Sequence, residues 1–182
     1  MKILKYLLIG VLVLVVLIFI VSLFFSSKVH VERTVLINAP VDVVFPQVNS
    51  VKNMHNWDPW AEKDPAAVNT FEGPEYGVGA IHKWTSKVSD VGNGTMTITE
   101  SVPNDQVKVK LEFEGRGEAM GGFQVKAIDG GTNATWSLDM DAGFNPIMRI
   151  MGGMMDKMVG PDFEKGLGKL KVLCESAPKT TA

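Results

Sequence analysis

The protein has 182 residues, with 18 lysines and arginines against 20 aspartates and glutamates, and 46% of its residues are hydrophobic. This length fits one domain of ordinary size plus an appendage and excludes a multidomain machine. With a formal net charge of −2 and no basic tract, the sequence lacks the electrostatic footprint of a nucleic-acid-binding protein, so no nucleic-acid partner is expected.

Cys174 is the only cysteine, so an internal disulfide is excluded and the fold must be held by a hydrophobic core. The cysteine and the three histidines are not spaced like the ligands of a zinc site. The sequence also lacks a P-loop, a nucleotide-binding glycine fingerprint and a nucleophile elbow. The sequence therefore predicts neither a metal nor another cofactor, and it predicts no catalytic residue.

The first apolar segment, Tyr6 to Phe25, contains 20 consecutive residues without a charge. An α-helix needs about 20 apolar residues to cross a bilayer. The alternative is a cleaved signal peptide, because Lys2 and Lys5 form a positive leading region. However, the apolar stretch exceeds the roughly 7–15 residues of a secretory signal, and bulky residues 23–25 stand where cleavage needs small ones. We expect residues 1–27 to be an uncleaved, single-pass membrane anchor.

The orientation of this anchor follows from the basic residues beside it. Lys2, Lys5 and the α-amino group precede the span, while Lys28 and Arg33 follow it. The difference slightly favours an N-terminus inside the cell, with the remaining domain on the extracytoplasmic side.

The chain after the anchor starts with a strand and a helix. Residues 28–37 alternate between apolar and polar side chains, as in a half-buried strand, and Arg33 interrupts the apolar side. Asn38 is the expected N-cap of a following helix, which Pro46 should kink or shorten. Residues 53–65 predict a short helix or turn and then a structured loop.

Residues 66–141 form a series of short alternating segments separated by turn residues. The clearest strand covers residues 106–114, in which apolar and charged side chains alternate throughout. Further strands are expected at 68–71, 80–87, 95–102, 122–128 and 134–140. Together with the first strand, the count is about seven.

The C-terminal part returns to helical spacing. Apolar residues recur there every three or four positions, at Met148, Met151, Met154, Met155, Met158, Phe163, Leu167, Leu170 and Cys174. Gly160 and Pro161 predict either a kink or a division into two helices at that point. Residues 177–182 are expected to be a flexible tail.

These elements predict an α+β fold in which one curved antiparallel sheet of about seven strands wraps around the long C-terminal helix, because the apolar face of the sheet needs a cover. Four segments then resemble a known family. These are Arg33–Phe45, Trp57-Asp58-Pro59-Trp60, Gly77-Val78-Gly79 and Phe163–Lys171. They are similar to the polyketide cyclase/dehydrase and lipid-transport family of the SRPBCC superfamily, whose members have the START-like, Bet v 1-like helix-grip fold. The resemblance covers residues 28–176.

The resemblance implies a cavity between the sheet and the C-terminal helix that is open to an apolar ligand. The residues expected to line it are Trp57, Trp60, His82, Trp84, Met151, Met154, Met155 and Met158. Each has an alternative interpretation. The methionines also fit a helix core, the two loop tryptophans also fit a packed corner or a membrane interface, and His82 also fits an outward-facing surface position.

We therefore expect a membrane-anchored protein that binds a hydrophobic small molecule, a lipid or an isoprenoid-like compound, without covalent chemistry. Two alternatives remain open. One is a cyclase or dehydratase that uses the same cavity, with His55, Asp58 or His82 transferring the proton. The other is a membrane-tethered module that binds an unknown protein partner.

Overall fold

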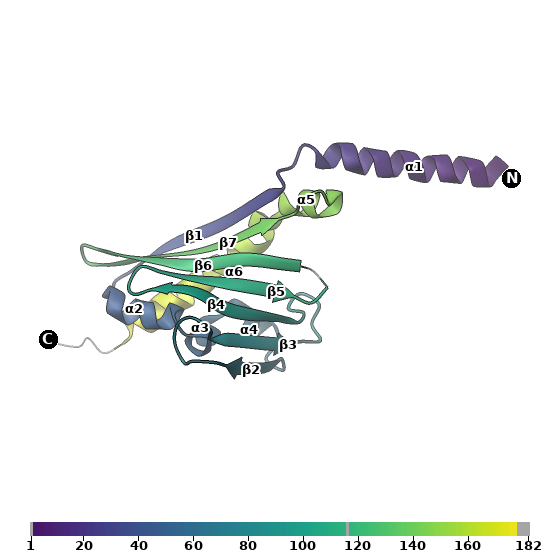
Figure 1. Cartoon of the computed structure of the whole chain (residues 1–182). Coiled ribbons are helices and arrows are strands. Elements are labelled where there is room, and N and C mark those ends of the chain that lie inside the picture. The colour runs from purple at the N-terminus through teal and green to yellow at the C-terminus, as the bar shows by residue number, and fades with distance from the viewer. Residues whose placement is uncertain (1, 116, 178–182) are drawn as a thin grey trace.

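The computed structural model describes residues 2–115 and 117–177. In these residues the chain forms one seven-stranded sheet and six helices (Figure 1). The strands are β1 (Lys28–Ile37), β2 (Val68–Glu72), β3 (Ile81–Thr85), β4 (Gly94–Val102), β5 (Gln106–Phe113), β6 (Gly117–Ile128) and β7 (Gly131–Asp141). The helices are α1 (Lys2–Ser22), α2 (Val41–Val48), α3 (Val51–Trp57), α4 (Pro59–Lys63), α5 (Pro146–Gly152) and α6 (Met155–Glu175).

The sheet is antiparallel throughout, with the order β1-β7-β6-β5-β4-β3-β2. The first strand therefore lies beside the last one, and Lys28 pairs with Asp141. Helices α2–α4 connect β1 to β2 and lie with α6 on one side of the sheet, here called the inner face (Figure 1). The predicted α+β helix-grip fold is confirmed, and β1 has the predicted bounds.

Strand β6 is longer than expected, because it begins at Gly117 and not at Gly122. Gly121 and Gly122, which resemble turn residues in the sequence, continue the ladder opposite Val109 and Lys108. The segment predicted as a short helix and a loop contains two short helices, α3 and α4.

The expected N-cap of α2 was wrong. The helix begins at Val41 after Pro40, and the backbone N–H of Asn38 instead donates to Glu175 Oε1 of α6 at 2.7 Å. Pro46 lies inside α2, which ends after eight residues, as its missing amide donor predicts.

The C-terminal helical region divides at a different place from the predicted one. Helix α6 continues through Gly160 and Pro161, and the division lies at Gly153 and Met154. Gly152 touches Val29 and Gly153 touches the ring of Phe25 so closely that a Cβ atom at either glycine would overlap these side chains. The chain can therefore turn against the start of β1 only because both residues lack a side chain.

Helix α1 begins and ends slightly earlier than the predicted span, at Lys2 and Ser22, and projects away from the sheet (Figure 1). Its mean hydropathy of 3.0 and its 21 residues suffice to cross a membrane, although a signal sequence near the N-terminus also meets these criteria of length and composition. The predicted tail includes residues 178–182, which lie outside the described residues.

Candidate ligand-binding face

Three tryptophans meet where the short helices reach the inner face. Trp57 of α3 is 2% exposed, and its Nε1 donates to the carbonyl oxygen of Gln47 at 3.3 Å. Its ring contacts Trp136 of β7 edge-on, with the ring centroids 5.4 Å apart, and Trp60 of α4 contacts the same ring at 5.9 Å. Trp57 thus forms a packed corner. Trp136 was not singled out in the sequence, although it occupies an inward position of an alternating strand.

Trp136 also joins the sheet to α6. Its ring stacks on Phe163 with centroids 4.2 Å apart and planes 4° apart. Gly166, one turn further along α6, faces Trp136 and Pro59, and a Cβ atom there would lie 2.7 Å from the Trp136 ring. The middle of α6 is therefore in direct contact with β7, so a ligand cannot enter at this point.

His82 lies on the inner face of β3 and is 5% exposed, so its alternative as an outward-facing surface histidine is wrong. Its ring stacks on Phe71 at 4.8 Å and meets His55 edge-on at 5.3 Å. Nε2 is 2.8 Å from Asn69 Oδ1, and since Asn69 Nδ2 donates to Ala67, this Oδ1 accepts and Nε2 carries the proton. Burial, and secondly the nearby His55, lower the pKa of His82 to about 4. The imidazole is therefore neutral at neutral pH.

His55 lies beside His82 and Asp58 lies near His55, but the three are not arranged as a proton relay. His55 Nδ1 is buried and has no hydrogen-bond partner among the described residues. Asp58 caps α4, where its Oδ1 accepts the Trp60 N–H at 2.9 Å, and burial raises the pKa of the Asp58 carboxyl. In the described part of the chain no hydrogen bond joins Asp58 to either histidine. The structure thus brings His55 and His82 together and leaves Asp58 in a structural role.

Beyond His82 the inner face is incompletely covered. Trp84, two residues further along β3, is half-buried, and its ring contacts Phe113 of β5 with centroids 6.0 Å apart. Other half-buried apolar side chains belong to the same region, namely Val29, Trp60, Leu111, Met140, Met155 and Val159. The region formed by Trp84, Phe113, Met140 and Met155 is called the open apolar end below.

The strand register places this region at one end of the sheet. Trp84 pairs with Gly94, which pairs with Phe113, and Phe113 pairs with Gly117. At the opposite edge of the sheet, the same end carries Asp141 of β7 and its partner Lys28 of β1, and five residues separate Lys28 from the end of α1. The open apolar end therefore lies at the end of the domain from which α1 departs.

The predicted methionine row is divided between two environments. Met155 packs against the apolar cluster around Phe163. In contrast, Met151, Met154 and Met158 are 43%, 55% and 54% exposed. These three side chains are exposed to solvent, Met151 on α5, Met154 at the N-cap of α6 and Met158 on α6.

A separate surface groove of about 510 Å³ lies between α3 and the C-terminal half of α6. Trp57, Gly168, Val172 and Leu173 contribute to its apolar lining, and Lys165 and Lys169 line it as well. Both lysines bind Glu62, and these contacts lower the pKa of Glu62 to about 2. One carboxylate is therefore shared by two lysines, and it offsets only part of their positive charge. No cluster of three or more metal-ligating side chains occurs in the described ranges.

The sequence model of the family described as "Polyketide cyclase / dehydrase and lipid transport" matches residues 28–175. The chain belongs to this family. The match begins at the first residue of β1 and ends at the last residue of α6, so it covers the whole domain and leaves out α1. No curated protein sequence matches the chain.

Solved structures of this fold agree with that assignment. The di-domain ARO/CYC StfQ from the steffimycin biosynthetic pathway has a TM-score of 0.60 at 12% identity, over 81% of this chain and 51% of that one. The Aha1 dimer from Colwellia psychrerythraea has a TM-score of 0.55 at 16% identity, over 82% and 98%. Protein CV1439 from Chromobacterium violaceum has a TM-score of 0.58 at 12% identity, over 80% and 96%. At these identities the likeness concerns the fold.

Proposed function

We propose that this member of the family is a membrane-anchored carrier or sensor that binds a hydrophobic small molecule, a lipid or an isoprenoid-like compound, without covalent chemistry. The open apolar end is the observation that carries the proposal. Trp84, Phe113, Met140 and Met155 present half-buried apolar surface beside the buried, neutral His82. A mostly apolar lining with one polar group to orient the ligand is typical of small-molecule sites.

Within this proposal the predicted ligand residues have different roles. Trp60, Trp84 and Met155 contact the ligand with apolar surface, and His82 offers the polar group. Trp57 supports them through packing, because it is already enclosed by Trp136 and its neighbours.

The anchor makes physical sense for such a task. Helix α1 inserts into the bilayer, residues 1–27 form the anchor, residues 28–176 form the ligand-binding domain and residues 177–182 form a tail. A domain tethered beside a bilayer meets membrane-soluble ligands at a high effective concentration. The open apolar end lies on the side of the domain that α1 leaves, so it faces the source of the ligand. The basic residues Lys2 and Lys5 favour an extracytoplasmic domain.

Native and denaturing mass spectrometry of the full-length protein, gently extracted from its own membranes, tests the proposal. We expect a stoichiometric adduct that is lost on denaturation and that identifies the ligand class. Trp84→Ala should reduce the adduct, whereas Met120→Ala, at an exposed position of β6, should not. An empty protein that also binds no added lipid or isoprenoid would contradict the proposal and favour a protein-interaction module.

A second candidate function is a cyclase or dehydratase, and the contact between His55 and His82 favours it. A neutral imidazole that is held in a buried position can accept a proton from a bound substrate. The ligand identified by mass spectrometry would then be converted by the wild-type protein and not by His82→Gln or His55→Gln. Equal conversion by all three proteins, or no conversion by any, would remove the enzyme hypothesis.

A further inference from the structure

We propose that α5 and the turns on either side of it form a second membrane contact, a lipid-surface contact that holds the open apolar end against the bilayer that α1 crosses. This inference rests on the proposed anchoring by α1. It assigns a role to exposed apolar residues that the ligand-binding proposal does not use.

The contact surface consists of Phe144, Ile147, Met151 and Met154. Phe144 is 96% exposed, and Ile147, Met151 and Met154 are 60%, 43% and 55% exposed. Ile147 and Met151 are four residues apart on α5 and therefore share one face of the helix. Neighbouring exposed large apolar residues of this kind mark a surface that is covered in the working protein.

The connection to α1 sets the position of this surface. Only five residues, 23–27, separate α1 from β1, and they span at most about 17 Å when fully extended. Asp141 pairs with the first residue of β1, and the Ala142 N–H donates to the Ser27 carbonyl oxygen at 2.7 Å. Phe144 follows two residues after Ala142. The contact surface thus lies close to the point where α1 leaves the bilayer, whichever way α1 tilts.

Close packing fixes α5 in this place. Gly152 lies against Val29 of β1, and Gly153 lies against Phe25 of the segment that follows α1. Figure 1 shows α5 beside the end of α1 that is nearer to the sheet. A bilayer crossed by α1 therefore meets α5 before it meets the rest of the domain.

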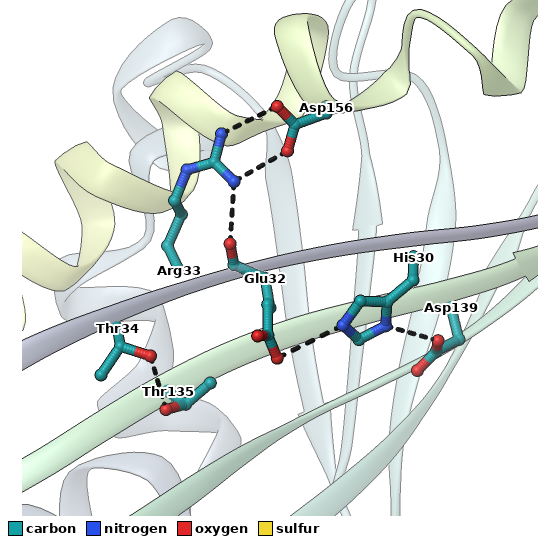
Figure 2. A network of polar contacts seen from close by, with 7 residues as sticks. All are labelled: His30, Glu32, Arg33, Thr34, Thr135, Asp139 and Asp156. Atoms are coloured by element: carbon teal, nitrogen blue, oxygen red, sulfur yellow. Dashed lines mark hydrogen bonds and ion pairs between the residues drawn. The ribbon is translucent and has the colours of Figure 1, made fainter.

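The charges around the surface favour lipid head groups over an apolar protein partner. Lys28 and Lys157 are exposed and form no ion pair in the part of the chain that the structure describes. Arg149 of α5 has a buried Nε without a hydrogen-bond partner among the described residues. Among the neighbouring acids, Asp139 binds His30 and Asp156 binds Arg33 (Figure 2), whereas Asp141 is exposed and accepts the Gly143 N–H. Apolar side chains flanked by free cations are typical of contacts with anionic membranes.

Site-specific fluorescence on the full-length protein tests the contact. Single cysteines replace Ile147, Ile128 and Val13, each carries an environment-sensitive fluorophore, and the protein is reconstituted into vesicles of phosphatidylcholine and phosphatidylglycerol. The native Cys174 is buried and stays unlabelled under brief treatment. Ile128 is the matched control, since it is 42% exposed at the opposite end of the sheet. Met151→Cys replaces Ile147→Cys if the latter fails to fold.

We expect a blue-shifted emission at position 147 that nitroxide lipids with a shallow label quench, and a water-like emission at position 128. At position 13, quenching of the fluorophore by nitroxide lipids with a deep label shows separately whether α1 is inserted in the bilayer. Water-like emission at position 147 with deep quenching at position 13 would overturn the contact and leave the anchor intact. A blue shift at 147 without lipid quenching would also overturn it, because a protein surface would then cover α5. Water-like emission at positions 147 and 13 would overturn the contact and the anchor together.

Discussion

Arg33 of β1 holds both carboxylate oxygens of Asp156 on α6, with distances of 2.7 Å from Nη1 to Oδ1 and 3.1 Å from Nη2 to Oδ2 (Figure 2). Its Nε donates to Glu164 Oε1 at 2.8 Å. Asp156, Gly160 and Glu164 follow at intervals of four residues and share one face of α6. The hydrogen bonds to Asp156 and Glu164 raise the pKa of Arg33, and Arg33 lowers the pKa of Asp156, so both groups are charged at neutral pH. The residue that interrupts the apolar alternation of β1 therefore attaches α6 to the edge of the sheet.

The first prediction concerns the glycine beneath this ion pair. A Cβ atom at Gly160 would overlap the Arg33 guanidinium, so Gly160→Ala should displace Arg33 and lose its contacts with α6. In an Arg33→Ala background the same change meets no guanidinium, and it should raise the free energy of unfolding by about 1 kcal/mol through helix propensity. Urea denaturation of the variants in a double-mutant cycle measures the difference. An equal effect of Gly160→Ala in both backgrounds would show that Arg33 does not depend on the space at Gly160.

A second prediction concerns the pH dependence of stability. The pKa of His82 is lowered from 6.5 to about 4 in the folded protein, so the unfolded state binds more protons between these values. The stabilising contribution of neutral His82 is complete above pH 6.5 and is lost as the pH falls through 4. Its upper limit is about 3 kcal/mol.

His82→Gln provides the comparison, since glutamine does not titrate. Denaturation curves from pH 7 to pH 4 should lose less stability in the variant than in the wild type, and NMR titration of the His82 ring should give its pKa directly. Parallel stability curves for the two proteins would mean that His82 is already accessible to water.

The strands were predictable because the alternation of apolar and polar side chains is visible within each short segment of the sequence. In β1 and β5 the side chains alternate between the inner face and solvent, so the pattern in the sequence is the pattern of burial. The division between α5 and α6 was not predictable. It depends on the contacts of Gly152 and Gly153 with Val29 and Phe25, which are distant in sequence, whereas Gly160 and Pro161 showed a stronger local signal and remained helical.

The candidate site shows the same limit. His82 and Trp84 were placed on one strand face by their spacing, but the spacing could not say that this face is the inner one, which depends on the pairing of β3 with β4. Helical spacing likewise could not distinguish Met155, which packs inward, from Met154, which is exposed next to it. The role of Trp136 could not be predicted from the sequence, because it depends on contacts with Trp57 of α3 and Phe163 of α6.

A third prediction concerns the packed corner. Trp57→Ala should lower the free energy of unfolding by about 3–5 kcal/mol, because it leaves a cavity between Trp136, Phe123 and α3. Trp57→Phe keeps much of the ring contact and loses the hydrogen bond to Gln47, so it should cost less. Thermal or urea denaturation measures both. Trp84→Ala is the control, since Trp84 is half-buried and should cost less than Trp57→Ala. Equal losses at the two positions would contradict the assignment of Trp57 to packing and Trp84 to the ligand.

The last prediction uses the single thiol as a probe of the far end of α6. Cys174 is 3% exposed, and burial raises the pKa of its thiol to about 11. Since the thiolate is the reactive form, the folded protein should react very slowly with a disulfide reagent at neutral pH, and the rate should rise sharply in denaturant. A labelling time course with and without urea tests this. If α6 instead detaches from the sheet to admit a ligand along its whole length, Cys174 becomes accessible in the native protein and fast labelling without urea would reveal it. Slow labelling would restrict ligand entry to the open apolar end, where Trp84 and Phe113 are already half-exposed.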